Sequence, residues 1–394
     1  MRETLDIKVP ELRFPEFSGE WEEKRLGDEI TLYNNKRIPL EKLERANRSG
    51  PYPYFGASGI IDSVDDFLFD GEYVLLAEDG ANIVLRSSPL AFLAEGQFWV
   101  NNHAHVFQSH GSNKFLAEEL ERQSFVKYNT GTAQPKLNSK TLLTIKVTVP
   151  ALPEQQKIAE FLTAVDEKIG KLKRKKELLE AYKKGAMQKL FSQEIRFKDD
   201  QGNPYPDWEE KRLGDIGSKS KRKNRANKSL PVLTNSAIQG VILQDSYFDR
   251  EITTEGNLDG YYLVDLGLFI YNPRISKHAK AGPINLNNAG AGLMSPLYTV
   301  FSINKGLQIF FKEYFKTTFW HRYMMAVSNF GVRHDRMNVT NDDFFAMPLP
   351  YPSLPEQQKI AEFLTGIDDK VTAVANQIDQ AAEFKKGLLQ KMFV

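Results

Sequence analysis

The sequence predicts two mixed α/β domains, each followed by a long α-helix, and three observations lead to this fold class. The segment LPEQQKIAEFLT occurs twice, at residues 152–163 and 354–365. The segment WEEKRLGD also occurs twice, at residues 21–28 and 208–215. Each copy of the first segment continues into a helical pattern, and the residues between the repeats alternate between strand-like and helix-like stretches. A chain that repeats its frame and varies its contents has two similar scaffolds that carry two different surfaces.

The composition suits a multi-domain globular protein. The chain has 394 residues, of which 41% are hydrophobic, and this length fits two to four domains. It contains no cysteine, so disulfides, thiolate metal sites and cysteine nucleophiles are excluded. The N-terminal segment shows no basic stretch followed by an apolar one, and no run of about 18 apolar residues occurs, so we expect a cytoplasmic protein. The net charge of +1 neither indicates nor excludes a nucleic-acid partner.

The repeats divide the chain into four parts. The residues between the repeats share almost no recognisable sequence. The copies are offset by 187 residues for WEEKRLGD and by 202 for LPEQQKIAEFLT, so the second middle is longer by 15 residues. We predict a first variable domain at residues 1–151 and a second at residues 196–352. A long helix is expected after each domain, at residues 152–195 and 353–394.

Apolar residues in both long helices recur at alternating steps of four and three, which is the pattern of a coiled-coil seam. The predicted seam residues are Ile158, Leu162, Val165, Ile169, Leu172 and Leu179 in the first helix and Ile360, Leu364, Ile367, Val371, Val374 and Ile378 in the second. Lys183 and Lys385 occupy matched seam positions, which they weaken unless their stems lie along the seam and their amines reach solvent. Each seam needs a partner, which we expect to be the other copy. The seam alone does not distinguish parallel from antiparallel pairing.

The two middles show strand and helix patterns in a similar order. In the first middle we predict strands within residues 71–86, 98–109 and 142–150 and a helix within residues 112–128. In the second we predict strands within residues 267–276 and 297–303 and a helix within residues 307–324. We therefore expect the two middles to share one fold with different side chains.

The sequence lacks the motifs of common catalytic sites. No phosphate-binding GxxxxGK[ST] loop and no HExxH metal motif occurs. Asn272 and Pro273 are followed by Arg274, so the Asn-Pro-Pro-aromatic element of adenine methyltransferases is missing. His103 and His105 alternate along a predicted strand, and a role in packing is far more common for such a pair than metal binding. We therefore expect neither a catalytic site nor a metal site.

Basic and amide side chains gather in two loops at matched places late in each middle. GTAQPKLN (131–138) precedes the first long helix, and GVRHDRMN (331–338) precedes the second. Residues 219–228 contain six basic residues and no acid. Such groups contact phosphates and base edges, although basic residues that only solvate a turn give the same pattern. The residues predicted to contact DNA are Gln134, Lys136, Lys219, Lys221, Arg222, Lys223, Arg274, Lys277, Arg333, His334 and Arg336.

The doubled segments resemble those of the specificity subunit of type I restriction–modification systems. LPEQQKIAEFLTAVDEKI and LPEQQKIAEFLTGIDDKV are similar to that family's two repeated regions. RFPEFSGEWEEKRLGD and its partial copy at residues 196–215 are similar to the beginning of each target-recognition domain. The resemblance covers essentially the whole chain. It implies two α/β (α+β) target-recognition domains joined by an antiparallel coiled coil of two long helices with pseudo-twofold symmetry.

The resemblance also implies a set of partners. A specificity subunit reads an asymmetric, bipartite site on double-stranded DNA and is not catalytic. Two modification (methyltransferase) subunits bring S-adenosylmethionine, and restriction subunits bring ATP- and Mg²⁺-dependent translocation and cleavage, so no cofactor is expected in this chain. Helices of about 38 residues form a rod about 55–60 Å long, which would hold half-sites one to two DNA turns apart.

Three other functions fit parts of the sequence. A stand-alone regulator with two DNA-reading domains would need no catalytic partners. A coiled-coil adaptor without a role in nucleic-acid binding is a further alternative, which the absence of salt-sensitive DNA binding would identify. An enzyme in its own right is the least favoured interpretation, because no catalytic constellation is found.

Overall fold

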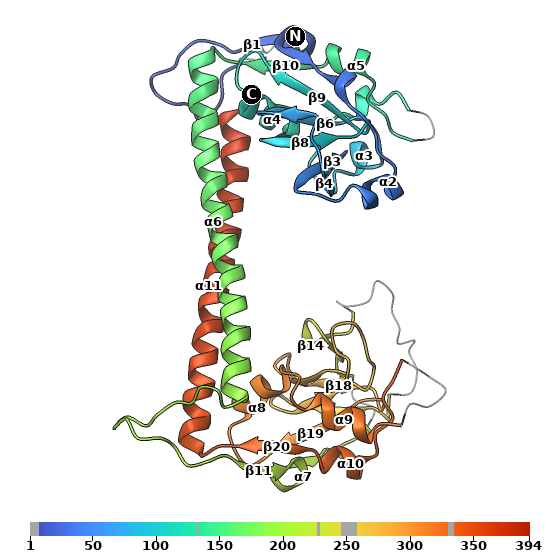
Figure 1. Cartoon of the computed structure of the whole chain (residues 1–394), viewed down its shortest axis with the longest axis vertical. Coiled ribbons are helices and arrows are strands. Elements are labelled where there is room, and N and C mark those ends of the chain that lie inside the picture. The colour runs from blue at the N-terminus through green and yellow to red at the C-terminus, as the bar shows by residue number, and fades with distance from the viewer. Residues whose placement is uncertain (1–7, 132–133, 227–228, 246–257, 330–334) are drawn as a thin grey trace. The chain divides into compact units, whose positions relative to one another are not determined.

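A computed structural model describes residues 8–131, 134–226, 229–245, 258–329 and 335–394, and the chain forms two compact units. The first unit contains Met1–Arg174 and Ala375–Val394, and the second contains Lys175–Val374. Each unit therefore holds one variable domain together with part of both long helices (Figure 1).

The two long helices, which we call the repeat helices, are α6 (Leu152–Phe191) and α11 (Leu354–Met392), of 40 and 39 residues. Within the first unit, Leu162 shares a hydrophobic cluster with the last residue of α11. Within the second unit, Leu190 near the end of α6 shares a cluster with Ile360 near the start of α11. The beginning of each helix therefore lies beside the end of the other, so the pairing is antiparallel, as the resemblance implied (Figure 1).

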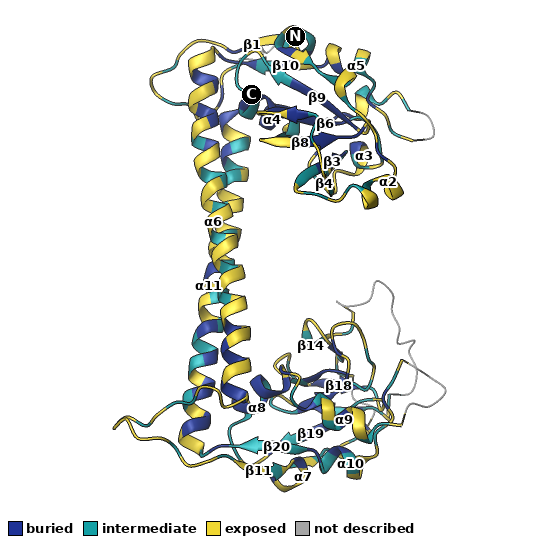
Figure 2. Cartoon of the chain, viewed as in Figure 1, coloured by how far each residue is buried: buried dark blue, intermediate teal, exposed yellow. Residues whose placement is uncertain are grey.

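The residues predicted for the seam are all buried or half-buried, while the other faces of the repeat helices are largely exposed (Figure 2). Leu162 and Leu364 occupy matched positions and are fully buried, whereas Leu178, outside the seam, is 53% exposed. The seam lysines depart from expectation. The amines of Lys183 and Lys385 do not extend to solvent but pair with carboxylates.

The first turn of each repeat helix is tied to the segment that leads into the preceding variable domain. The guanidinium of Arg13 donates to both carboxylate oxygens of buried Glu154, at 2.7 Å each. Arg196 donates in the same way to buried Glu356, at 3.1 and 2.8 Å. A fork of two charge-assisted hydrogen bonds fixes both distance and orientation. An arginine before each WEEKRLGD segment and a glutamate in each LPEQQ segment therefore recur because they bind each other.

The first variable domain contains two four-stranded sheets and a two-stranded ribbon. One sheet has the antiparallel order β2-β9-β6-β7, and the other has the order β4-β3-β8-β5 with β3 and β8 parallel. The ribbon pairs β1 with β10. The strands are β1 (Glu22–Arg25), β2 (Ile30–Leu32), β3 (Tyr52–Gly56), β4 (Gly59–Val64), β5 (Phe69–Asp70), β6 (Tyr73–Ala77), β7 (Ala91–Ala94), β8 (Gln97–Val100), β9 (Ala104–Ser109) and β10 (Lys146–Val149). The helices are α1 (Leu26–Glu29), α2 (Lys42–Asn47), α3 (Asn82–Leu85), α4 (Asn113–Arg122) and α5 (Ser139–Thr144).

The second variable domain repeats this topology. Its sheets have the orders β12-β19-β16-β17 and β14-β13-β18-β15, with β13 and β18 parallel, and its ribbon pairs β11 with β20. The strands are β11 (Glu209–Arg212), β12 (Gly217–Lys219), β13 (Val232–Ser236), β14 (Gly240–Leu243), β15 (Tyr262–Val264), β16 (Phe269–Tyr271), β17 (Ile284–Leu286), β18 (Gly292–Met294), β19 (Thr299–Ile303) and β20 (Pro348–Tyr351). The helices are α7 (Leu213–Ile216), α8 (Gln308–Phe315), α9 (His321–Val327) and α10 (Asn341–Phe345). The prediction of one fold with different side chains is therefore confirmed.

Strand β6 is buried on both faces and joins the two cores of the first domain. Val74 and Leu76 belong to the cluster that contains α4 and the repeat helices. Tyr73 and Leu75 belong to a second cluster, which contains residues of both sheets. Because successive side chains of a strand point to opposite faces, a continuous apolar run serves both cores.

Two segments that the sequence predicted as strands are partly helical. The residues after β6 include α3, and the residues before β10 include α5. The side chain of Asn138 accepts a hydrogen bond from the N–H of Thr141 at 2.9 Å and so caps the start of α5. Asparagine is a favoured N-cap residue, and this local signal prevails over the β-branched residues that follow.

The helix predicted within residues 307–324 is two helices, α8 and α9, separated by a turn. The hydroxyl of Thr317 donates to the carbonyl of Tyr314 at 2.7 Å, and the indole of Trp320 donates to the carbonyl of Phe315 at 3.2 Å. These side chains satisfy carbonyls that a continuing helix would use, and α8 therefore ends.

Replacing Leu162 or Leu364 with alanine is expected to lower the free energy of unfolding by about 2–5 kcal/mol, because each change leaves a cavity in a packed seam. Leu178→Ala is the matched control at an exposed position of α6 and is expected to change it by less than about 0.5 kcal/mol. Urea unfolding followed by circular dichroism measures all three variants. Equal effects of Leu162→Ala and Leu178→Ala would contradict the assignment of the buried face.

Candidate nucleic-acid interface

The two loops predicted to contact DNA lie at the same place in the two domains. In the first domain, the N–H of Leu137 donates to the carbonyl of Glu78, just after β6, at 2.7 Å. In the second, the N–H of Met337 donates to the carbonyl of Pro273, just after β16, at 2.9 Å. Strands β6 and β16 occupy the same place in the strand order. The C-terminal end of each loop is therefore hydrogen-bonded to the residues that follow the corresponding central strand, which is β6 in the first domain and β16 in the second.

The next residues of each loop show the same correspondence with different side chains. An isolated β-bridge pairs Asp79 with Lys136 in the first domain. The matching bridge in the second domain pairs Arg274 with Arg336. One domain therefore sets an acid beside a base at this place, while the other sets two arginines together.

The buried side chain of His105 contacts the C-terminal end of the first loop. The His105 ring is fully buried, and its Nε2 lies 2.7 Å from the carbonyl oxygen of Leu137. A carbonyl only accepts, so Nε2 carries the proton and Nδ1 accepts from the amide of Asn34 at 2.8 Å. The Asn34 oxygen in turn accepts the N–H of Val106 at 3.0 Å. Both ring nitrogens of His105 therefore have hydrogen-bond partners in the neutral form, and the Glu78 carboxylate lies 3.6 Å from Nδ1.

Glu78 brings two cations to the base of the same loop. Its carboxylate accepts a hydrogen bond from Arg37 at 2.8 Å and lies 3.3 Å from the amine of Lys136. Burial alone would raise the pKa of Glu78, but the hydrogen bonds from Arg37 and Lys136 lower it below its ordinary value. The charge of Lys136 is therefore balanced within the chain, while Gln134 is exposed.

The second loop and the segment after β16 together place an excess of positive charge around one carboxylate. Arg274 is exposed, and its Nε lies 3.8 Å from a carboxylate oxygen of Asp335. Arg336 Nε lies 3.7 Å from the same oxygen and has no hydrogen-bond acceptor among the described residues. Lys277 is exposed nearby in sequence. Arg333 and His334 lie outside the described residues.

The basic run that begins at Lys219 is partly engaged within the second domain. The N–H of Leu263 donates to the carbonyl of Arg222 at 3.0 Å, so the run extends the sheet that contains β15. The side-chain partners are Asn341 for Lys219, Asp265 for Arg222 and the ring of Tyr262 for Lys223. Burial, and then the charge of Lys219, lower the pKa of Lys223. Lys221 is exposed and makes no ion pair with the described residues.

A cluster of asparagines beside Arg274 was not predicted from the sequence. The amide of Asn235 donates to the carbonyl of Ile270 at 2.7 Å, and the amide of Asn285 donates to Asn235 Oδ1 at 2.8 Å. Asn235 lines a cavity of about 290 Å³ together with Asn272 and Arg274. These residues come from separate strands and loops. No spacing in the sequence would have brought them together.

The described residues contain no group of three or more side chains suited to hold a metal ion. His103 and His105 have different partners, because His103 Nδ1 lies 2.9 Å from Asp79 whereas His105 bonds Asn34 and Leu137.

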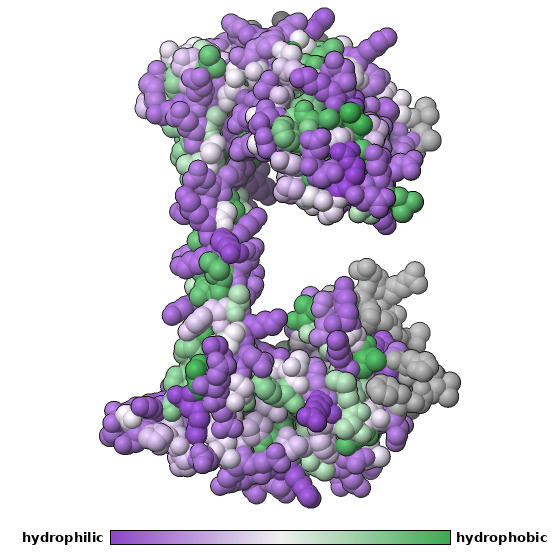
Figure 3. Space-filling view, viewed as in Figure 1, coloured by the Kyte–Doolittle hydropathy of each residue, from purple (hydrophilic) through white to green (hydrophobic). Residues whose placement is uncertain are grey.

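Hydrophilic side chains cover most of the visible surface of each unit (Figure 3). Among the described helices, none combines the length and the apolar character needed to span a bilayer.

Comparison with known proteins identifies similar chains. A family model described as the type I restriction modification DNA specificity domain matches residues 18–181 and 205–383. The type I restriction enzyme MjaVIII specificity subunit of Methanocaldococcus jannaschii is 25% identical over 416 residues, which cover 96% of this chain and 92% of that protein. The type I restriction enzyme EcoprrI specificity subunit of Escherichia coli is 31% identical over 160 residues, which cover 39% of this chain and 38% of that protein.

One solved structure is similar over nearly its whole length. The S subunit of a type I restriction–modification system from M. genitalium superposes with a TM-score of 0.60 at 17% sequence identity. The match covers 98% of this chain and 99% of that one. At this identity the likeness concerns the fold.

The pH dependence of stability is expected to report on His105. Burial lowers the pKa of His105 below its ordinary value of about 6.5. As the pH falls below about 6.5, His105 binds a proton in the unfolded chain but stays neutral in the folded chain, so the folded state loses stability. His105→Gln cannot titrate and serves as the control for all other groups. Thermal unfolding between about pH 7 and pH 5 should show the wild type losing stability relative to the variant, and parallel curves would contradict the neutral ring.

Proposed function

Because the chain belongs to the type I restriction–modification DNA specificity family, we propose that its two variable domains read the two unlike halves of one bipartite DNA site. The family model matches twice, and each match spans one variable domain and most of the repeat helix that follows it. The chain recognises DNA and is not the catalytic subunit. Two reading domains in one chain give a site with two parts.

The observation that carries the proposal is the pair of matched loops with unmatched side chains. Loops at the end of β6 and β16 are held by the same backbone contacts. The first presents Gln134 and a lysine balanced by Glu78. The second presents Arg336, and Arg274 from the segment after β16 lies beside the same carboxylate of Asp335. Side chains decide which bases are read, and the backbone decides where the reading surface lies. Two like scaffolds with unlike loops would therefore read unlike half-sites.

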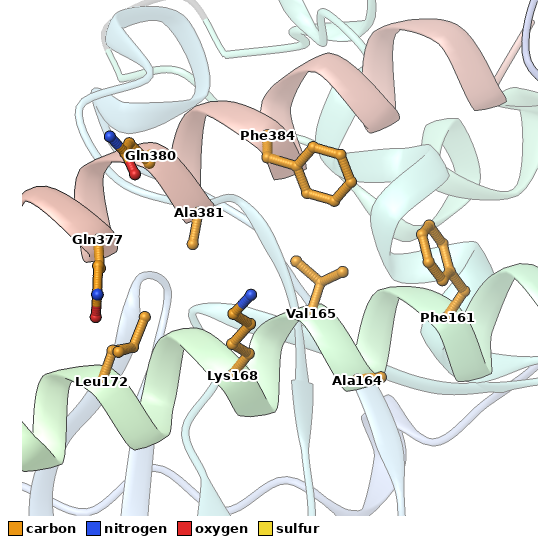
Figure 4. A pocket seen from close by; sticks show the side chains of 9 residues that line it. All are labelled: Phe161, Ala164, Val165, Lys168, Leu172, Gln377, Gln380, Ala381 and Phe384. Atoms are coloured by element: carbon orange, nitrogen blue, oxygen red, sulfur yellow. The ribbon is translucent and has the colours of Figure 1, made fainter.

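The repeat helices are the proposed attachment sites for two modification subunits. In the first unit they border an apolar groove of about 530 Å³, lined by Phe161, Val165 and Leu172 from α6 and by Ala381 and Phe384 from α11. These side chains converge on the groove (Figure 4), and Phe384 is 56% exposed. An exposed aromatic residue beside an apolar groove is typical of a protein interface. One modification subunit would dock here.

The cofactors of the reaction are proposed to lie on the partner subunits. The modification subunits would hold S-adenosylmethionine, and restriction subunits would hold ATP and Mg²⁺. This chain would recognise the DNA sequence and would provide the surface on which those subunits assemble. The repeat helices would also set the spacing between half-sites, because both variable domains are anchored on the same two helices.

Single-molecule sequencing of DNA from cells that co-express the chain with the modification subunit of its system tests the proposal. Methylation is expected at one asymmetric motif with two defined parts separated by an undefined spacer. The double variant Arg274→Ala/Lys277→Ala should lower the extent of methylation and leave the half-site read by the first domain unchanged. A continuous palindromic motif, or methylation that does not depend on this chain, would refute the proposal.

The cations of the second domain are expected to contribute to the salt dependence of DNA binding. Each phosphate contact that is lost reduces the slope of log K against log salt by about one, so Arg274→Ala/Lys277→Ala should reduce it by about two. Lys305→Ala, at an exposed lysine elsewhere in the domain, is the matched control. Fluorescence anisotropy at several salt concentrations gives the slopes. If the double variant keeps the wild-type slope, these cations do not contact phosphate.

A further inference from the structure

In the second unit, a lysine enters the seam between the repeat helices and is held by two carboxylates. The amine of Lys183 on α6 donates to Asp368 on α11 at 2.6 Å and to Glu313 on α8 at 2.7 Å. The Glu313 side chain is 1% exposed. Burial alone would lower the pKa of Lys183, but its hydrogen bonds to Asp368 and Glu313 raise it. This ion cluster therefore joins both repeat helices to a helix of the variable domain.

The first unit contains the same cluster with the roles of the repeat helices exchanged. The amine of Lys385 on α11 donates to Asp166 on α6 at 3.0 Å and to Glu118 on α4 at 2.8 Å. The lysine and the aspartate each recur at the offset of 202 residues that relates the repeat helices. The glutamate comes from a variable domain in both units. The two middles differ in sequence, but both place a glutamate where they contact the repeat helices.

The variable domains carry a short repeat of their own at this junction. Residues 111–118 read GSNKFLAE and residues 306–313 read GLQIFFKE. Glycine, phenylalanine and glutamate therefore recur at an offset of 195 residues, in the pattern Gly-x-x-x-Phe-x-x-Glu, which we call the docking motif. The other five positions differ, which hides the motif in a search for identical segments.

The glycine of the docking motif lies against the first glutamine of LPEQQ in both copies. A Cβ at Gly111 would lie 2.3 Å from Gln155 Oε1, and a Cβ at Gly306 would lie 3.0 Å from Gln357 Oε1. The same oxygen accepts the N–H of the residue after the glycine, at 3.1 and 2.8 Å. Each glutamine also donates to the proline carbonyl just before its helix, at 2.9 and 2.8 Å. One side chain thus fixes the start of α4 or α8 to the start of a repeat helix.

The phenylalanine of the docking motif packs at the C-terminal end of a repeat helix. The ring of Phe115 stacks on Phe393 with centroids 5.0 Å apart, and the ring of Phe310 lies 5.4 Å from Phe191. The tryptophan of each WEEKRLGD segment completes the cluster, at 5.6 Å from Phe115 and 6.1 Å from Phe310. The phenylalanine of the motif therefore packs on a phenylalanine and a tryptophan that recur in both units.

We propose that the docking motif is the set of positioning residues that attaches each variable domain to the repeat helices in one orientation, whatever DNA sequence that domain reads. An apolar side chain in place of the glutamate would pack in the same space without the cost of desolvating charges. A buried ion cluster instead accepts few geometries, because the lysine must meet both carboxylates at once. Orientation, more than stability, is what the glutamate and the lysine provide.

Hydrogen–deuterium exchange of the full chain, without DNA or partner subunits, tests the proposal. Glu313→Gln and Lys183→Met are each expected to speed exchange in α8 by about tenfold or more, because each removes the buried ion pair that joins α8 to α6. Lys316, which also donates to Glu313 at 2.7 Å, lies at the end of α8 itself and does not replace that link. Helix α4 in the same molecule is the internal reference and should keep its wild-type rates. Lys184→Met, at the exposed neighbour of Lys183, is the matched control.

A pair of conservative changes separates positioning from simple packing. Glu313→Asp shortens the acceptor and should speed exchange in α8, while adding Lys183→Arg lengthens the donor and should restore the wild-type rate. Lys183→Met/Glu313→Asp should not restore it. This pair keeps the test decisive even where Glu313→Gln fails to fold.

The outcomes distinguish this inference from the proposed function. Wild-type exchange of α8 in both single variants, or an equal change with Lys184→Met, would overturn the positioning role. Failure of Lys183→Arg to rescue Glu313→Asp would overturn it as well. Since no DNA or partner is present, a wrong assignment of the half-sites would leave these rates unaffected.

Discussion

A charged amine inside a helix seam is stable only beside carboxylates, and this constraint governs the junctions of the chain. Lys183 and Lys385 each meet one aspartate from the opposite repeat helix and one glutamate from a variable domain. Helix pairing and domain attachment therefore depend on the same ion cluster. The bidentate arginine contacts of Glu154 and Glu356 add a second tie at the start of each repeat helix.

The residues that recur in the chain lie at the junctions between each variable domain and the repeat helices. The residues that differ form the cores and the loops of the variable domains. The offset between copies grows from 187 residues at WEEKRLGD to 195 at the docking motif and 202 at LPEQQKIAEFLT. The extra residues of the second domain therefore lie on both sides of the docking motif, within the part that varies. A domain can change length and reading surface while the contacts at its junction remain the same.

Sequence patterns that depend on local spacing predicted the repeat helices and several strands. They could not predict contacts between residues that are distant in the sequence. The step of four and three marked the buried face of the repeat helices, but it gave no sign that the lysines at 183 and 385 have acidic partners. The break after α8 depends on side chains that satisfy carbonyls, such as those of Thr317 and Trp320. The support of the first loop by His105 joins Asn34, Val106 and Leu137, which no spacing relates. Comparison of the two middles at an offset of 195 would have found the docking motif.

A structure of the chain bound to a duplex that carries both half-sites, determined by cryo-electron microscopy together with its modification subunits, tests the account most directly. The account predicts that each lysine keeps its aspartate and glutamate partners in both units. It also predicts that base contacts come only from the variable domains and differ between them. Base contacts from the repeat helices, or two junctions with different partners for Lys183 and Lys385, would contradict it.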